Sequence, residues 1–253
     1  MPGELLEVKG LMVWFENAIA VNDFSMEVAT GEIVSVLGPN SAGKTTLMHA
    51  ISGLLVDMRK KEARKGGERI TLMGEMKFQG EDIFADPPIS RIRRGISLCR
   101  ERHPIFPDST VEENLRISTY LRRDREIRGT FDLIYSMFPS LRELRKRKAG
   151  FCSGGEQQML AIGMALMTRP RLLLLDEPLL GLSPAMQSSV VRTITQIRGG
   201  GATILVTEQY ARPLLPIVTR GYVMTNGVLT LQGTGQELMS NPEVRSAFMG
   251  MAI

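Results

Sequence analysis

Apolar side chains recur along the chain with two different periods. Residues 24–28 alternate between apolar and polar side chains, which is typical of a half-buried strand, and residues 33–37, 172–175 and 203–206 are short, largely apolar runs typical of buried strands. A helical period starts at Lys44, directly after a glycine-rich turn. Because strands alternate with helices, the pattern predicts an α/β fold with a mostly parallel sheet.

Helical patterns dominate between residues 91 and 169, which predicts an inserted helical unit. Within it, Thr110 and Glu113 have the spacing of a capping box, for a helix that we expect to run through Leu121. A further helix is expected from about residue 184 to 197, ending in a run of glycines.

Two polar segments predict a turn and a loop. Asn226 and Gly227 stand between two apolar-rich runs, which is a strong signal for a hairpin with a type I′ turn. Residues 59–70 are basic and lack apolar periodicity, so we expect a solvated loop there, followed by short strands around Ile70 and Lys77.

The composition is that of an ordinary folded protein. The 253 residues are 43% hydrophobic and 23% charged, enough for two domains or one large α/β domain. No apolar run approaches the roughly 20 residues that span a bilayer, and the N-terminal segment has no secretory signal, so we expect a cytoplasmic protein. Cys99 and Cys152 lie far apart, without the spacing of a zinc site or a disulfide framework. The net charge of +4 leaves room for a nucleotide, a nucleic acid or a lipid surface as an anionic partner.

The segment GPNSAGKTT directly follows a predicted buried strand and precedes a predicted helix. It matches the pattern G-x-x-x-x-G-K-[ST], in which backbone N–H groups and the helix N-terminus bind phosphate oxygens. Lys44 would neutralise the β- and γ-phosphates of a nucleotide, and Thr45 would offer its hydroxyl to Mg²⁺. The alternative is an ordinary glycine-rich turn. The candidate phosphate-binding residues are Gly38, Pro39, Asn40, Ser41, Ala42, Gly43, Lys44, Thr45 and Thr46.

Two adjacent carboxylates end the segment LLLLDEP. Neighbouring side chains on an extended chain point in opposite directions, so Asp176 and Glu177 are expected to have different roles. Asp176 would hold Mg²⁺ or its waters, and Glu177 would orient and deprotonate an attacking water near the γ-phosphate. The alternative is an acidic turn in which Pro178 ends a core strand.

The segment CSGGEQQ opens another predicted helix, and Ser153 and Glu156 have the spacing of a capping box. Gly154 and Gly155 leave the helix N-terminus bare of side chains, so that it could approach an anion closely; a capped helix without a ligand is the alternative. The chain thus offers two helix N-termini suited to phosphate. They either share one nucleotide within the chain or meet across a dimer.

These three segments resemble the Walker A, Walker B and signature motifs of the ATP-binding cassette (ABC) family. The resemblance runs nearly end to end, and IFPDSTVEENL, ILVTEQ and GTGQELMSNPEVRSAFMG resemble the ATP-binding subunits of branched-chain amino acid importers. It implies a single ABC ATPase domain over residues 1–253, with a P-loop NTPase (RecA-like) core, an N-terminal antiparallel β part and a helical subdomain inserted at about residues 103–168.

The resemblance also implies a function and its partners. The chain would bind ATP and Mg²⁺ and hydrolyse ATP to power an importer of branched-chain or related amino acids. Its partners would be the transmembrane permease subunits, contacted near Ile105 and Phe106, a second ATPase subunit that is identical or a sister chain, and indirectly an extracellular substrate-binding protein. No nucleic acid is expected, and the subunit would lie in the cytoplasm on the inner face of the cell membrane.

In the head-to-tail dimer that the family implies, the signature motif of one chain faces the γ-phosphate held by the other chain. Phe15, with Trp14 beside it, stands where the family places an aromatic side chain that stacks on adenine; a core aromatic in a strand is the alternative. The residues implied to bind nucleotide across the dimer are Ser153, Gly154, Gly155 and Glu156.

Several positions depart from the commonest cassette pattern. Glu101, in LCRERHPIFP, stands at the Q-loop position, where a carboxylate can still bind Mg²⁺ or water. Gln209 stands at the switch position, where it can hydrogen-bond the γ-phosphate or the attacking water but cannot carry a proton near neutral pH, unlike the usual histidine. The implied metal-binding residues are Thr45, Glu101 and Asp176. The implied catalytic residues are Glu177, the favoured base, with Lys44 and Gln209.

Other departures lie outside these positions. Cys152 replaces the first leucine of the signature, Ser41 replaces a common P-loop glycine, and residues 57–69 are longer than the family pattern by roughly a dozen residues, for which the sequence offers no functional account. Clusters of basic residues could meet nucleic acid or anionic lipid, although solvated faces are the simpler explanation, and the aromatic residues that stack bases are not interleaved. These clusters lie at residues 59–69, 91–94, 122–128 and 142–148.

Two other classes of function stay open at this point. A non-transport cassette acting on nucleic acid or ribosomes usually fuses two cassettes or inserts a long coiled coil, and this sequence has neither. A regulatory module would bind ATP but scarcely hydrolyse it, because of the departures above. An ordinary GTPase is disfavoured, since the sequence has no N-K-x-D motif.

Overall fold

The computed structural model describes residues 3–67, 69–102, 104–122 and 126–249. Within these ranges the strands form a six-stranded sheet with the order β10-β9-β3-β8-β7-β6 and a four-stranded sheet with the order β2-β1-β4-β5. The larger sheet consists of β3 (Ile33–Leu37), β6 (Ile96–Cys99), β7 (Leu172–Asp176), β8 (Thr203–Glu208), β9 (Arg220–Thr225) and β10 (Val228–Gly233). The smaller sheet consists of β1 (Glu4–Phe15), β2 (Ala18–Ala29), β4 (Ile70–Phe78) and β5 (Glu81–Asp82).

The larger sheet is mostly parallel. Strand β3 pairs in parallel with β8 and β9, and β7 pairs in parallel with β6 and β8, while the edge strand β10 is antiparallel to β9. The described strand pairs of the smaller sheet are antiparallel. These pairings confirm the predicted α/β fold with a mostly parallel sheet and an N-terminal antiparallel part.

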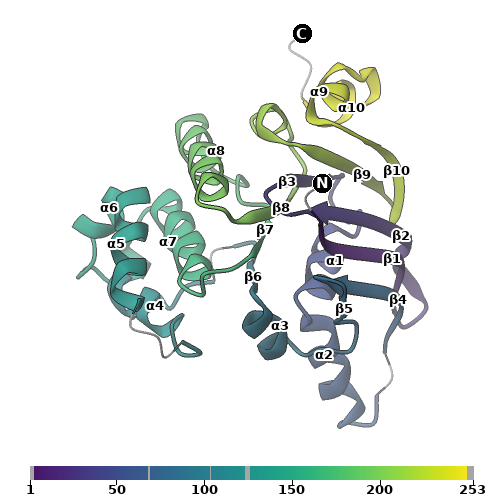
Figure 1. Cartoon of the computed structure of the whole chain (residues 1–253), viewed down its shortest axis with the longest axis horizontal. Helices are drawn as coiled ribbons and strands as arrows, with labels where there is room; N and C mark the ends of the chain where they lie inside the picture. Colours follow the sequence, from purple (N-terminus) through teal and green to yellow (C-terminus); the bar gives the residue numbers. More distant parts are fainter. Residues whose placement is uncertain (1–2, 68, 103, 123–125, 250–253) are drawn as a thin grey trace.

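Helices and the smaller sheet cover the two faces of the larger sheet (Figure 1). Helices α7 and α8, with α4, α5 and α6 beyond them, lie on one side, whereas α1 and the smaller sheet lie on the other. The helices are α1 (Lys44–Ile51), α2 (Leu54–Ala63), α3 (Pro88–Arg94), α4 (Val111–Ile117), α5 (Ile127–Met137), α6 (Pro139–Glu143), α7 (Gly154–Leu166), α8 (Pro184–Gly199), α9 (Gly235–Ser240) and α10 (Pro242–Phe248), with short 3₁₀ turns η1 (Ala149–Phe151) and η2 (Leu215–Ile217).

The central strands are buried on both faces. In β7, Leu172 and Leu174 pack into the core shared with α1 and the smaller sheet, whereas Leu173 and Leu175 pack into the core shared with α7 and α8. A strand that is covered on both sides needs apolar residues at successive positions. This explains why the predicted strands 33–37, 172–175 and 203–206 stand out as apolar runs, and all three are confirmed.

The hairpin prediction is also confirmed. Asn226 and Gly227 join β9 to β10 with φ angles of 50° and 82°. Two successive residues in the left-handed region are what a type I′ turn requires.

The predicted loop at residues 59–70 is wrong in its first half, because α2 continues to Ala63. Leu55 and Val56 are buried and attach the first turn of α2 to the core. Lysine, arginine, glutamate and alanine all favour helix, so they extend α2 without any apolar period.

The helix after Thr110 is shorter than predicted, ending at Ile117 instead of Leu121. The hydroxyl of Thr119 donates to the carbonyl oxygen of Arg116 at 2.8 Å. This side chain thereby competes for a backbone acceptor at the end of the helix.

One of the basic clusters is not a solvated face throughout. Arg91 is 1% exposed, and its Nη1 donates to the carbonyl oxygens of Ala50 (2.9 Å) and Ile51 (2.7 Å) at the C-terminus of α1. Burial lowers the pKa of the Arg91 guanidinium to about 10. Residue 68 of the predicted loop, residue 103 at the predicted start of the helical subdomain, and residues 123–125 of the cluster 122–128 lie outside the described residues. None of the described helices is long and apolar enough to cross a membrane.

Candidate functional site

The loop between β3 and α1 follows a path that only glycine permits at two positions. Gly43 has a φ of 104°, and a Cβ built on it would lie 2.3 Å from the carbonyl oxygen of Ala20. A Cβ on Gly38 would lie 2.3 Å from the carbonyl oxygen of Met224. The backbone of the loop is therefore packed directly against neighbouring backbone, with its N–H groups leading into the N-terminus of α1.

The β9–β10 turn is hydrogen-bonded to this loop. The N–H of Gly227 donates to the carbonyl oxygen of Ala42 at 2.8 Å, and the carbonyl oxygen of Gly227 accepts from the N–H of Asn22 at 2.9 Å. A single turn thus connects the P-loop to β2 of the smaller sheet.

Lys44 is held inside this loop. Its side chain is 3% exposed, and Nζ donates to the carbonyl oxygens of Gly38 (2.8 Å) and Pro39 (2.9 Å). Nζ also forms an ion pair with Oε1 of Glu177 at 2.9 Å. A buried charge needs such partners, because desolvation without them is costly.

Asp176 lies at the end of β7, opposite the start of α1. Its Oδ1 accepts hydrogen bonds from the hydroxyls of Thr207 (2.7 Å) and Thr45 (3.3 Å). Burial raises the pKa of the Asp176 carboxyl, while these two hydrogen bonds act in the opposite direction. The second oxygen, Oδ2, is buried and has no hydrogen-bond partner among the described residues.

The unpartnered Oδ2 of Asp176 is a possible ligand for a divalent cation. Mg²⁺ prefers oxygen ligands and is usually held by one or two protein oxygens together with substrate phosphates. Asp176 Oδ2 and the Thr45 hydroxyl supply such oxygens next to the phosphate-binding loop. The residues present therefore fit a Mg²⁺ ion that arrives with a nucleotide.

Glu177 leaves the extended conformation of β7. Its φ is 47°, and its N–H donates to the carbonyl oxygen of Thr207 (3.1 Å) and to the Thr207 hydroxyl (3.2 Å). This turn brings the carboxylate of Glu177 to Lys44 while that of Asp176 stays with Thr45. The two adjacent acids thus meet the same loop at different places, and a left-handed residue costs of order 1–3 kcal/mol unless the surroundings hold it.

Lys44, Thr45 and Glu177 line one pocket of about 410 Å³, whereas Asp176, which bonds to Thr45, does not line it. The structure brings together the loop residues 40–46 with Glu177 and Glu101, and Glu101 is ion-paired with Arg102 at 3.2 Å. The remaining lining residues are Ala20, Arg102 and Leu180. Gln209 is exposed and directly follows β8 at the same edge of the sheet, although it does not line the pocket.

Two groups of predicted nucleotide-binding residues lie elsewhere. Phe15 ends β1 and packs, partly buried, against the core under the smaller sheet, and it does not line the P-loop pocket. The signature segment at the N-terminus of α7 does not line it either. The capping box of Ser153 and Glu156 is present, with the N–H of Ser153 donating to Oε2 of Glu156 at 2.7 Å.

The two signature glycines differ in their surroundings. Gly154 has no atom within 4 Å of an added Cβ, so it leaves the helix end open. A Cβ on Gly155 would lie 2.2 Å from Cε of Met186, in the first turn of α8. The second glycine thus leaves room for the side chain of Met186 to pack against the start of α7.

Two residues of the site were not predicted from the sequence. Thr207 contacts both acids of β7, as described above. Glu208 is 3% exposed, and its Oε1 accepts from the N–H of Leu179 at 2.8 Å, in the segment that follows Glu177. Burial, together with the negative charge of Glu177, raises the pKa of the Glu208 carboxyl to about 8. The signal in the sequence that could have identified Glu208 is its position as a charged residue at the end of the apolar run ILVTE.

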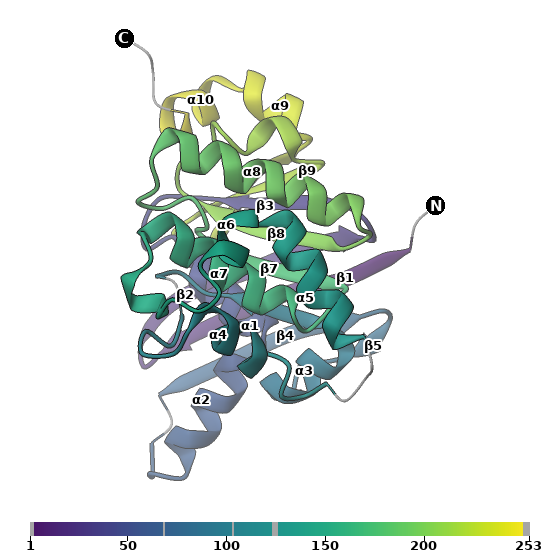
Figure 2. The same cartoon turned by 90° about the vertical axis from the view of Figure 1, so that its left-hand side faces the viewer.

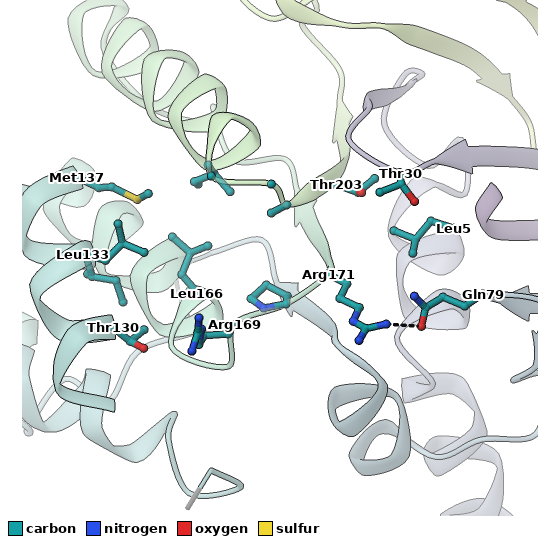
Figure 3. A pocket seen from close by; sticks show the side chains of 16 residues that line it. Leu5, Thr30, Gln79, Thr130, Leu133, Met137, Leu166, Arg169, Arg171 and Thr203 are labelled. Atoms are coloured by element: carbon teal, nitrogen blue, oxygen red, sulfur yellow. Dashed lines mark hydrogen bonds between the residues drawn. The ribbon is translucent and has the colours of Figure 1, made fainter. Parts of the chain in front are cut away.

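A second cavity of about 460 Å³ lies between α5, α7 and the beginning of β8 (Figure 3). Its walls include Leu133, Met137 and Leu166, and Nη1 of Arg171 at its edge donates to Oε1 of Gln79 at 2.7 Å. It lies where β7 and β8 begin, whereas ligands of open α/β sheets bind beyond the carboxyl ends of the strands. The P-loop pocket is at those carboxyl ends.

Comparisons with known proteins agree with this geometry. The family described as "ABC transporter" matches residues 21–180. The chain is 36% identical over 246 residues to the high-affinity branched-chain amino acid transport ATP-binding protein BraG of Pseudomonas aeruginosa, covering 97% of this chain and 100% of that protein. It is 33% identical to the probable branched-chain amino acid transport ATP-binding protein LivF of Archaeoglobus fulgidus, covering 90% and 92%.

Other relatives differ in what they transport. The lipopolysaccharide export system ATP-binding protein LptB of Acidithiobacillus ferridurans is 32% identical, covering 98% of this chain and 97% of that protein. Among solved structures, the ADP conformation of an ATP-binding cassette of an ABC transporter matches with a TM-score of 0.82 and 26% identity, covering 98% of this chain and 100% of that one. Sequence and fold therefore lead to one conclusion: the chain belongs to the ABC transporter family, as an ATP-binding cassette, the ATPase subunit of a transporter.

Proposed function

We propose that this chain powers an importer of branched-chain or related amino acids. The observation that carries the proposal is its similarity, along nearly the whole chain, to BraG and LivF, which are named for branched-chain amino acid transport. Lipopolysaccharide export is the second candidate, because LptB is similar over the same length. An ATP-binding regulatory module with little hydrolysis is the third.

For hydrolysis, we assign the residues in and next to the P-loop pocket as follows. Lys44 and the backbone N–H groups of residues 38–46 bind the phosphates, and Asp176, Thr45 and Glu101 hold Mg²⁺ or its waters. The ion neutralises phosphate charge when it is bound. Glu177 orients the attacking water and accepts its proton, with Gln209 as a hydrogen-bonding partner of the water or the γ-phosphate.

The Lys44–Glu177 ion pair gives this assignment an order of events. A phosphate that binds Lys44 competes with the Glu177 carboxylate, which now accepts the 2.9 Å contact from Nζ. When Lys44 turns to the phosphate, Glu177 is left free to accept a proton from water. Nucleotide binding would therefore prepare the base for the reaction.

A second ATPase subunit would complete the site. Neither the signature segment 153–156 nor Phe15 lines the P-loop pocket of its own chain. We propose that the signature segment faces the nucleotide of an identical or sister chain, as the family resemblance implies, and that Phe15 reaches adenine from the edge of the smaller sheet.

We further propose that the whole chain is one ATPase domain, with a helical subdomain at about residues 103–168 that contacts the permease. A groove between α3, the segment after α4 and α7 supports this contact, because Tyr120 at its edge is 87% exposed. Phe106 is 49% exposed in the same subdomain. The subunit would then lie in the cytoplasm on the inner face of the membrane, with the extracellular substrate-binding protein as an indirect partner.

Glu177→Gln tests the catalytic assignment. Loss of a general base costs roughly 10²–10⁴-fold in turnover, so we expect ATPase activity to fall by about that factor while ATP binding persists and the ATP-bound dimer accumulates in size-exclusion chromatography. Glu75→Gln, which removes an exposed carboxylate on β4, is the matched control. Unchanged hydrolysis in Glu177→Gln would remove Glu177 from the mechanism.

Co-purification tests the transport assignment. The tagged chain should bring down a permease pair that stimulates its ATPase activity, and deletion of that pair should abolish uptake of labelled leucine, isoleucine or valine. Recovery of lipopolysaccharide-export components instead would favour the second candidate.

A further inference from the structure

Helix α2 carries an extension that projects from the body of the molecule. Leu55 and Val56 are buried at its beginning, but Lys60 and Lys61 are exposed, as are Arg64 and Lys65 in the turn that follows. Figures 1 and 2 show this segment reaching beyond the sheets and the other helices in both views. We call residues 57–67 the basic arm; they fall within the segment that exceeds the family pattern in length.

The arm carries one of the positive clusters of the chain; another, at residues 142–148, has five lysines and arginines and one acid. Residues 57–67 contain five lysines and arginines and two acids, a net +3, whereas the whole chain has a net charge of +4. Among the described residues, the ion pairs of the arm comprise only Lys61 with Asp57, at 2.8 Å. The other four cations of the arm (Arg59, Lys60, Arg64 and Lys65) have no ion-pair partner there, so they are available to an external anion.

The position of the arm indicates which surface it can reach. Helix α2, from which the arm extends, packs beside α3, where Arg93 is also exposed, and the arm lies at the end of the molecule opposite α9 and α10 (Figure 2). Ile92 of α3 lines the groove that we propose for the permease. An arm that extends from this end would point toward the membrane in which the permease is embedded.

We propose that the basic arm binds the anionic phospholipid headgroups of that membrane. This inference rests on the proposed function only for the orientation of the subunit. Lysines and arginines close to an anionic leaflet are attracted by its negative surface potential. The phosphate groups of lipids need no shaped pocket, which suits cations spread around the exposed surface of a helix and its following turn.

The chemistry of the arm favours lipid over the other polyanions. Residues 54–67 contain no aromatic side chain that could stack on a base. Met58, 40% exposed, is the large apolar side chain that the arm presents, whereas protein interfaces are centred on several buried apolar or aromatic anchors. A charged, mostly polar projection matches a headgroup layer best.

Vesicle sedimentation with the full chain and no nucleotide tests this proposal. The probes are vesicles of phosphatidylcholine alone and of phosphatidylcholine with phosphatidylglycerol at roughly 3:1, the second carrying the negative surface potential. We expect binding to the anionic vesicles only, weakening as salt rises, because screening shortens the reach of surface charges.

One variant removes four cations from the arm. Its substitutions are Lys60→Gln, Lys61→Gln, Arg64→Gln and Lys65→Gln. Each cation near an anionic surface strengthens binding by about fivefold, so we expect a loss of at least about tenfold, even if only some of them reach the surface. The matched control removes the same charge from an exposed cluster around the C-terminus of α6, and its vesicle binding should weaken by less than about twofold. Its substitutions are Arg142→Gln, Arg145→Gln, Lys146→Gln and Lys148→Gln.

Three results would overturn the proposal. They are an arm variant that still binds anionic vesicles like the parent, an equal loss in both variants, and a parent chain that does not bind the anionic vesicles. A single-stranded oligonucleotide that binds the parent as tightly as the vesicles, through the same residues, would also overturn it. Basal ATPase activity without vesicles should be unchanged in both variants, and its absence in the parent would count against the proposed function instead.

Discussion

The P-loop pocket and the cavity of Figure 3 are similar in size but differ in how their side chains are arranged. The P-loop pocket, about 410 Å³, gathers a buried lysine, two carboxylates and glycines that fix a backbone path, and each of these groups is held by a named partner. The cavity of about 460 Å³ has mostly apolar walls, and its arginines lie exposed at its edge.

The difference shows that convergence of polar groups identifies the site, whereas volume does not. In the P-loop pocket, residues from the segments that follow β3, β6 and β7 meet because parallel strands end at one edge of the sheet. The cavity is a space left between α5, α7 and the beginning of β8, without such a group of polar side chains. Substitutions should therefore have large effects in the first region and small effects in the second.

Gly43→Ala should have the largest effect. The new methyl group would lie 2.3 Å from the carbonyl oxygen of Ala20, at a φ of 104° that alanine rarely adopts, so the loop must move. We expect ATP binding to fall by more than about 100-fold, since misplaced donors lose the phosphate contacts, as measured with a fluorescent nucleotide analogue.

Gly66→Ala is the control for backbone strain. Gly66 has a φ of 77° but no atom within 4 Å of an added Cβ, so alanine there meets the same conformational cost without the clash. Equal nucleotide binding by Gly43→Ala and Gly66→Ala would show that close backbone packing does not shape the loop.

Glu208→Gln should change how stability depends on pH. The Glu208 carboxyl has its pKa raised from 4.5 to about 8, so its contribution to stability is fully present below pH 4.5 and is lost as pH rises through 8. Glutamine can still accept the hydrogen bond from Leu179 but does not ionise.

Urea unfolding from pH 5 to 9 measures this effect. Between these limits the parent should lose at least about 1.4 kcal/mol more than the variant, the equivalent of one pKa unit. Parallel curves for the two proteins would mean that Glu208 stays ionised in the folded state.

Ser41→Gly should give a smaller, stabilising change. Ser41 has a φ of 64°, in the region where a residue with a Cβ is disfavoured by about 1–2 kcal/mol. Glycine removes that strain but makes the unfolded chain more flexible by about 0.4–1 kcal/mol, so we expect a net gain of about 0.5 kcal/mol in the free energy of unfolding. A loss of stability would mean that the serine hydroxyl has a role in holding the loop.

Leu133→Gln should have the smallest effect. Leu133 is 53% exposed on the wall of the second cavity. The free energy of unfolding should change by no more than about 0.5 kcal/mol, as for most surface substitutions, and ATP turnover should be unchanged. A large loss of turnover would give the cavity a part in the reaction and break the comparison with the P-loop pocket.

The sequence predicted the central strands and most of the pocket for physical reasons that can be named. Strands covered on both faces need apolar residues throughout, and the P-loop is a local motif whose glycines, lysine and threonine are adjacent in the chain. Thr207 and Glu208 were missed because pairing between distant strands brings them in, with Thr207 beside Asp176 and Glu208 beside Leu37.

The C-terminal half of helix α2, residues 59–63, was predicted as a loop for the opposite reason. Only the first turn of α2 packs on the core, so the residues beyond Val56 show no apolar period even though they are helical. An apolar period of 3.6 residues indicates a helix with one buried face. A helix that projects into solvent has no buried face, so it shows no such period.

The β9–β10 turn has a consequence for nucleotide binding. Because Gly227 bonds to both Ala42 and Asn22, the phosphate-binding loop is braced before any ligand arrives. A loop that already has its binding conformation loses little conformational entropy when it binds an anion, which favours high affinity. Residues late in the chain thereby help to set the phosphate affinity of a motif near its beginning, and a deletion of the β9–β10 turn should weaken phosphate binding.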